Sequence, residues 1–193
     1  MISVQDAANT FVYFALKGDD EPCTNMRLNK LLYFAQGHAL ERFGKPLFSA
    51  SFEAWDYGPV VPEIYHKYKY CGDNPIAVTD DDYNPASLPP EIQEFLIDIS
   101  LRYETYSTSA LVSMSHKPGS PWSLVKRDCN IPVEDIKAWF AGPGVQQGGV
   151  AKKTRKRHSR AVNALKMLPA SWHDAAEDAY WEEEARRLAP KNC

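Results

Sequence analysis

The feature that most constrains the fold is a change of residue pattern between positions 27 and 65. The segment RLNKLLYFAQ at 27–36 has the apolar period of an amphipathic helix. The segment FEAWDY at 52–57 is rich in aromatic residues typical of strands, and Gly58-Pro59 follows it at once. Pro62 then suits the first turn of another helix. Because a hairpin this small is not stable alone, it must pack on the flanking helices.

Two amphipathic helices are predicted before the aromatic segment. Ser3 and Asp6 have the spacing of a capping box, and the apolar period that follows them stops at Gly18. Thr24 is the next candidate N-cap, and the period of the second helix stops at Gly44. The two apolar faces are expected to pack against each other.

Further helices are predicted after a short β-hairpin, which we place around residues 47–57, and after a turn at Gly58-Pro59 that follows it. Each begins at a proline or at a capping serine, over residues 62–72, 89–103, 107–116 and 132–140. The sequence therefore predicts a mainly α protein: a compact multi-helix domain with a short hairpin, plus a C-terminal helical extension.

Charge separates that extension from the domain. The net charge is −3, yet no acidic residue lies between 152 and 169. We expect a domain at 1–141, a Gly-rich linker at 142–151 and a basic-then-acidic helical extension at 152–193. The expected polyanion-binding residues are Lys152, Lys153, Arg155, Lys156, Arg157 and Arg160. A basic arm on an acidic body suits partners that carry charge, such as a basic toxin, nucleic acid or a second copy of the chain.

Cysteine usage and hydropathy bear on the compartment. The four cysteines form no Cys-x-x-Cys pair, no secretory leader is recognisable, and no apolar run approaches the ~20 residues that span a bilayer. We expect a cytoplasmic protein with reduced thiols and no membrane contact.

Few residues in the sequence are arranged in a way that suits catalysis. His116 is the residue best suited to acid–base chemistry, but no nucleophile elbow or metal-binding spacing accompanies it. We interpret it as a helix-end residue that hydrogen-bonds to backbone and packs against Trp122. Asp80-Asp81-Asp82 lacks the spacing of a Ca²⁺ loop and is interpreted as a solvated acidic loop. No enzyme activity, cofactor or metal is predicted.

The aromatic segment has two interpretations. Trp and Tyr fill cores efficiently, and they also dominate the hot spots of protein interfaces. Both can hold at once, and we expect Trp55 inside the protein with Tyr57 near the rim of a contact surface.

A third motif, HKPGSPW at 116–122, follows the helix that begins at residue 107. With the segments at 27–36 and 52–65, in that order, it resembles the SocA-like antitoxin family, whose shared module is called the Panacea domain. The resemblance covers roughly residues 3–141. The residues expected to contact a partner or to form the family's motifs are Leu31, Tyr33, Trp55, Tyr57, Gly58, Pro59, Val60, Tyr65, His116, Pro121 and Trp122.

Members of that family are encoded beside toxins and neutralise them, by direct binding or by delivery to an ATP-dependent protease. The resemblance therefore implies a non-enzymatic antitoxin whose partner is a cognate protein toxin. A protease and a homo-oligomer stay open as further partners. Two other classes also stay open: a nucleic-acid-binding regulator that uses residues 152–160, and an enzyme that uses His116.

Overall fold

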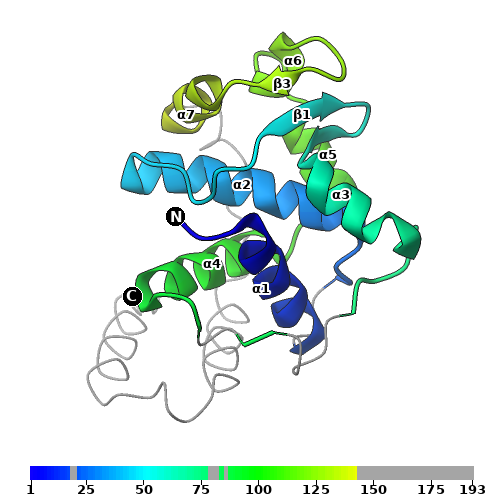
Figure 1. The fold of residues 1–193 in the computed structure, drawn as a ribbon. Coiled ribbons are helices and arrows are strands. Elements are labelled where there is room, and N and C mark those ends of the chain that lie inside the picture. Colours follow the sequence, from blue (N-terminus) through cyan, green and yellow to red (C-terminus); the bar gives the residue numbers. More distant parts are fainter. Residues whose placement is uncertain (18–20, 78–82, 85–86, 143–193) are drawn as a thin grey trace, which may run out of the picture. The chain divides into compact units, whose positions relative to one another are not determined.

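The structure, a computed structural model, describes residues 1–17, 21–77, 83–84 and 87–142. Its centre is helix α2 (Asn25–Phe43), in which every residue from Arg27 to Leu40 is buried. Burial on all sides requires neighbours on all sides. Figure 1 shows α2 between α1 (Val4–Lys17) and α4 (Pro90–Tyr103) on one side and α7 (Val133–Ala141) on the other. The segment 27–36 is thus the middle of the core.

The remaining elements are short. They are the helices α3 (Pro62–Tyr68), η1 (Lys69–Cys71), α5 (Thr108–Ser115) and α6 (Pro121–Leu124), and the strands β1 (Phe52–Trp55), β2 (Gly58–Val60) and β3 (Asn130–Ile131). The protein is mainly α with one small antiparallel sheet in the described ranges, which confirms the predicted fold class. None of the described helices has both the length and the apolar character needed to cross a membrane.

The helix ends confirm the capping residues predicted from sequence. At the start of α1, Ser3 Oγ accepts a hydrogen bond from the Asp6 amide at 3.0 Å and donates one to the Asp6 carboxylate at 2.6 Å. Thr24 Oγ1 accepts a bond from an amide in the first turn of α2, and Gly44 ends that helix with a φ of +68°. Ser107 caps α5 in the same way as Thr24 caps α2. Local chemistry therefore sets these boundaries.

The hairpin differs from the prediction in its position, and Gly58-Pro59 differs in its role. β1 and β2 are antiparallel with Trp55 opposite Gly58, so the turn is Asp56-Tyr57 and the hairpin covers 52–60, not 47–57. Gly58 and Pro59 open β2 instead of forming the turn. The strand order is β2-β1-β3, so β2 is an edge strand, which tolerates the missing N–H of a proline. The third strand and α6 were not predicted.

The side chain of Gln36 explains why residues 47–48 stay outside the hairpin. Its Oε1 accepts hydrogen bonds from the Leu47 and Phe48 amides, at 3.0 and 3.3 Å, and its Nε2 donates to Phe48 O at 3.0 Å. The buried glutamine thus substitutes for a partner strand. Because these backbone groups are already paired, the segment has no need to join a sheet.

Aromatic rings fill the space between α2, the sheet and α7. Tyr33 lies edge-to-face with Phe34, Phe52 and Phe140, with ring centroids 5.5–5.7 Å apart. A Cβ at Gly37 would come within 2.3 Å of the Phe140 ring, so this glycine lets α7 approach α2. Tyr33 Oη is buried without a hydrogen-bond partner among the described residues, and burial raises the pKa of that hydroxyl.

Three predictions fall outside the described residues. They are the acidic loop at 80–82, the linker at 142–151 apart from its first residue, and the extension at 152–193 with its basic tract. They stay predictions.

Candidate functional site

Three hydrogen bonds fix the backbone of the hairpin and of the residue that precedes α3, and His116 lies beside the turn. Trp122 Nε1 donates to Trp55 O at 2.8 Å, and His116 Nε2 lies 3.3 Å from Asp56 O. On the other side, Lys30 Nζ donates to Pro59 O at 2.9 Å, and Asn29 Oδ1 accepts a hydrogen bond from the Val61 amide at 2.9 Å. The three motifs are therefore brought together around residues 55–61.

His116 lies where the sequence predicted. It is the C-cap of α5, its Nδ1 donates to Val112 O at 2.6 Å, and its ring centroid is 3.7 Å from that of Trp122. Ser115 Oγ is 3.3 Å from the same nitrogen, but this serine is 1% exposed and donates to Val112 O. A nitrogen that donates to a carbonyl cannot also accept the serine proton. The pair therefore lacks the geometry of a nucleophile and its base.

Gly58 packs where these motifs meet. Its φ is +101°, and a Cβ there would lie 2.7 Å from Ser115 Oγ and 2.9 Å from Lys30 Cε. Both the dihedral and the space favour glycine. The residue lets the hairpin approach α2 and the end of α5 closely.

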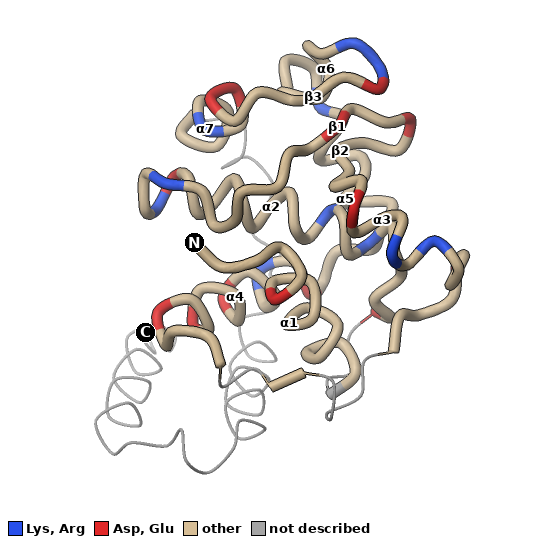
Figure 2. Tube along the Cα trace, in the orientation of Figure 1, with Lys and Arg blue, Asp and Glu red and all other residues tan. Residues whose placement is uncertain are grey.

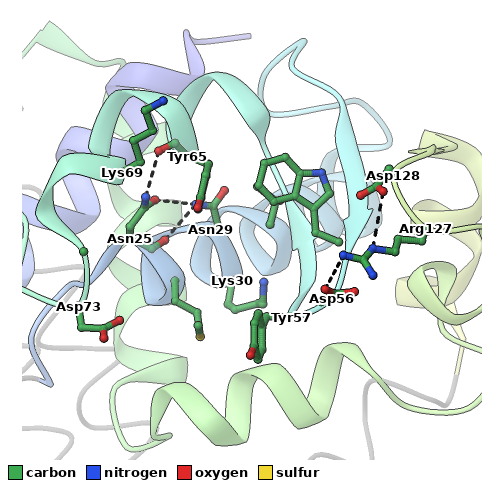
Figure 3. Close-up of a pocket in the computed structure, with 14 residues that line it drawn as sticks. Asn25, Asn29, Lys30, Asp56, Tyr57, Tyr65, Lys69, Asp73, Arg127 and Asp128 are labelled. Carbon is green, nitrogen blue, oxygen red and sulfur yellow. Dashed lines mark hydrogen bonds and ion pairs between the residues drawn. The ribbon is translucent and has the colours of Figure 1, made fainter.

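Two asparagines one helical turn apart fasten α3 to α2. Asn29 Nδ2 donates to the backbone oxygen of Asn25 at 2.9 Å and to its side-chain oxygen at 3.0 Å. Asn25 Nδ2 in turn donates to Tyr65 O at 3.0 Å (Figure 3). Val61, the N-cap residue of α3, supplies no side-chain cap of its own. Side chains of α2 hold α3 in place instead.

Several of the predicted site residues belong to the scaffold. Tyr33 and Leu31 are buried in α2, and Gly58, Pro59, Val60 and Pro121 are buried where the hairpin and α6 pack. Trp122 is partly exposed. The buried residues of this set lie beneath the exposed surface and support it.

The aromatic residues above this scaffold reach solvent. Tyr57 at the hairpin turn is 66% exposed and Tyr65 on α3 is 36% exposed. Trp55, expected inside the protein, is partly exposed, and its ring lies edge-to-face with Tyr65 at a centroid distance of 4.8 Å. The outward face of β1 places it there, because the strand buries Phe52 and Ala54 on the other face.

These aromatic residues line a pocket of about 350 Å³ between the N-terminal half of α2, the hairpin and α3 (Figure 3). Lys30 is at its base, 1% exposed, and burial lowers the pKa of its ammonium group to about 7. The remaining lining residues are mostly polar: Asn25, Met26, Asn29, Asp56, Val60, Lys69, Gly72, Asp73, Arg127 and Asp128.

Ion pairs close one side of the pocket. Arg127 Nη2 is 2.6 Å from the Asp56 carboxylate, and Arg127 Nε is 3.6 Å from the Asp128 carboxylate. Figure 2 shows this loop, basic and then acidic, beside the acidic tip of the hairpin. The Asp128 amide also donates to Ala54 O at 2.8 Å, so the loop and the hairpin form one surface.

The sequence profile described as "Antitoxin SocA-like, Panacea domain" matches residues 28–123. The chain is also 31% identical over 172 residues to antitoxin SocA of Caulobacter vibrioides (strain NA1000 / CB15N), covering 83% of this chain and 84% of that protein. The chain belongs to the SocA-like antitoxin family. No solved structure matches it.

The matched region of the SocA-like family holds the three side chains that hydrogen-bond to the backbone of residues 55–61, and also His116. It also includes the hairpin and α3, whereas α1 and α7 lie outside it. The family assignment thus covers the hairpin, its supports and most of the pocket.

Sequence reasoning on this SocA-like chain missed much of the pocket. Lys30 and Asn29 were part of a helical motif, but nothing in the motif said that their polar ends turn toward the hairpin. Neither residue interrupts the apolar stripe of the helix, so the pattern gave no sign that the helix is buried on their side as well. Met26 and Asp73 had no signal, because exposed single residues are ordinary.

Proposed function

We propose that this protein neutralises a cognate toxin by direct, stoichiometric contact, and that the contact surface is the turn of the hairpin with the rim of the adjacent pocket. The observation that carries the proposal is the exposed aromatic turn on a backbone fixed from both sides. Tyr57 is 66% exposed, although the residues beside it are held by the side chains of Trp122 and Lys30.

Physical chemistry supports this surface over other exposed regions. Tyrosine and tryptophan supply large contact areas with few rotatable bonds, so little entropy is lost on binding. A backbone that is already fixed reduces that loss further. Charged residues around the pocket, Asp56 and Arg127 among them, can form the polar rim that surrounds such a hot spot.

The proposal is tested with the toxin encoded by the neighbouring gene. Co-expression of the full chain should restore growth, and the two proteins should co-purify. Tyr57→Ala should weaken binding by at least ~2 kcal/mol, or roughly 30-fold, if the residue is a hot spot. Tyr70→Ala is the matched control, because Tyr70 is 80% exposed but does not line the pocket. Equal loss in both variants, or none in either, would contradict the proposed surface.

Delivery to an ATP-dependent protease is the second mode, and it also starts with direct contact. Rescue that depends on such a protease would assign this mode. Rescue at strongly substoichiometric antitoxin in cells without these proteases would instead indicate enzymatic detoxification and overturn the proposal. We place the protein in the cytoplasm, where its cysteines stay reduced; Cys23, Cys71 and Cys129 are free thiols in the structure.

A further inference from the structure

The ammonium group of Lys30 is short of partners at the base of the pocket. An ammonium has three N–H donors, and within the described ranges the Lys30 group has one hydrogen-bond acceptor, Pro59 O at 2.9 Å. No described carboxylate lies within ion-pair distance of it, although the side chain is 1% exposed. A buried charge normally has a counter-ion, because loss of hydration is costly.

The acidic residues of the pocket do not supply this counter-ion. Asp56 and Asp128 pair with Arg127 on one side of the pocket. Asp73 follows η1 in the chain, and Figure 3 shows it on the opposite side, away from Lys30. None of the acidic residues that line the pocket therefore neutralises Lys30, which lines the same pocket.

We propose that this pocket binds a carboxylate carried next to an apolar group, with Lys30 as its counter-ion. The source is a protein partner, through its C-terminal residue or an acidic side chain. This choice of source rests on the proposed function. The carboxylate site itself rests on the geometry of the pocket.

The walls of the pocket fit the apolar part of such a ligand. Trp55 and Tyr65 form an edge-to-face pair on the wall, and Met26 adds a flexible apolar side chain from α2. The volume of about 350 Å³ lies at the lower end of the roughly 300–1,000 Å³ of small-ligand sites. The pocket thus suits one or two residues of a peptide.

Several other elements also place ionisable groups near the pocket. The hairpin contributes Asp56 and Tyr57, α3 contributes Tyr65, η1 and the next residues contribute Lys69 and Asp73, and the loop before β3 contributes Arg127 and Asp128. His116, the C-cap of α5, lies on the same side of Gly58 as the Lys30 side chain. Burial lowers the pKa of Lys30 to about 7.

The test uses the full chain and small probes in two matched pairs. The first pair is N-acetylphenylalanine and its amide, and the second is N-acetylglutamate α-amide and N-acetylglutaminamide. Binding is followed by NMR shifts of the Trp55 indole N–H. The acid of at least one pair should bind at least tenfold more tightly than its amide. Preference for the first pair indicates a C-terminal carboxylate, and preference for the second indicates an acidic side chain.

The pH dependence identifies the counter-ion. Affinity for the acid should fall about tenfold between pH 6 and pH 8, because the charged fraction of a group with a pKa of about 7 falls by that factor. Lys30→Met should abolish the preference for the acid. Lys67→Met, an exposed lysine on α3 that does not line the pocket, should keep it.

Two results on the wild-type chain overturn the inference without any variant: equal affinity for acid and amide in both pairs, or an affinity that is flat between pH 6 and pH 8. The outcome is separate from that of the proposed function. If the acids bind but the toxin does not co-purify, the carboxylate site stands and the proposed function fails. If the toxin binds while acid and amide are not distinguished, the carboxylate site fails.

Discussion

Gly58 shows at the scale of one residue how the motifs depend on each other. A Cβ added to it would meet Lys30 of α2 and Ser115 of α5, and its φ of +101° lies in the half of the Ramachandran plot that residues with a side chain rarely occupy. Gly44 also has a positive φ, of +68°, but a Cβ there would meet nothing within 4 Å. Alanine substitutions at these two glycines therefore separate the free-energy cost of the dihedral from the free-energy cost of the steric contact.

Gly58→Ala should therefore destabilise the protein more than Gly44→Ala. We expect about 1–2 kcal/mol for Gly44→Ala, from the dihedral alone. Gly58→Ala adds an overpacking cost of about 1–3 kcal/mol, because the new methyl group displaces Lys30 or Ser115. Urea unfolding of both variants measures the difference. If the two free energies of unfolding fall equally, the close approach at Gly58 is not a constraint.

At the scale of elements, Gln36 decides where the sheet begins. Aromatic residues at 47–57 favour extended structure, and that pattern predicted one hairpin over the whole segment. The structure divides the segment, because Gln36 pairs with the backbone of Leu47 and Phe48, whereas Phe52 to Trp55 pair with β2 and β3. One side chain of α2 thus takes the place of a strand.

Gln36→Met should be costly although the two side chains have similar length. The change leaves three buried backbone hydrogen bonds unmade, at about 1–3 kcal/mol for each group left without a partner. Gln5→Met is the control, because the part-buried amide of Gln5 in α1 donates, among the residues that the structure describes, to the side chains of Asn9 and Tyr68 and not to backbone. Thermal unfolding should show a clearly larger loss for Gln36→Met. Similar losses would mean that water replaces the buried bonds.

At the scale of the whole molecule, burial of ionisable groups links folding to pH. Burial lowers the pKa of Lys30 from 10.5 to about 7 and raises that of Cys23 from 9.0 to about 12. It also lowers the pKa of His38, with the Arg102 charge acting in the same direction. These three groups affect stability in different pH windows.

The free energy of unfolding should rise between pH 7 and pH 9. In that window the unfolded chain keeps a proton on Lys30 that the folded protein has lost, so unfolding takes up a proton and higher pH favours the fold. The expected gain is about 2 kcal/mol over the two pH units. Urea unfolding under reducing conditions at pH 7, 8 and 9 measures it. Lys30→Met should give a flat profile, and a wild-type profile that is flat or falling would refute the shift.

The domain at 1–141 should fold without the extension. Phe140 of α7 packs against Tyr33 and Gly37 of α2, so the chain up to α7 already forms a packed core. A chain cut after Gly142 should unfold cooperatively near the melting temperature of the full chain, as measured by circular dichroism. Loss of cooperativity would make the extension part of the core.

The full chain, and not the cut one, should bind heparin through the basic tract at 152–160, with an affinity that falls as salt rises.

The sequence by itself determined the features that depend on neighbours along the chain. Capping at Ser3, Thr24 and Ser107 depends on contacts three residues away, so the helix starts were predictable. Only the tertiary structure decided the rest. β1 pairs with Asn130-Ile131, and Trp122 donates a hydrogen bond to Trp55 O across 67 positions. The local sequence pattern of one segment does not indicate which distant segment it will contact. The pocket exists only where such segments meet: Lys30 Nζ finds its acceptor on the hairpin, at Pro59 O, and Asn29 Oδ1 accepts a hydrogen bond from the Val61 amide just after the hairpin.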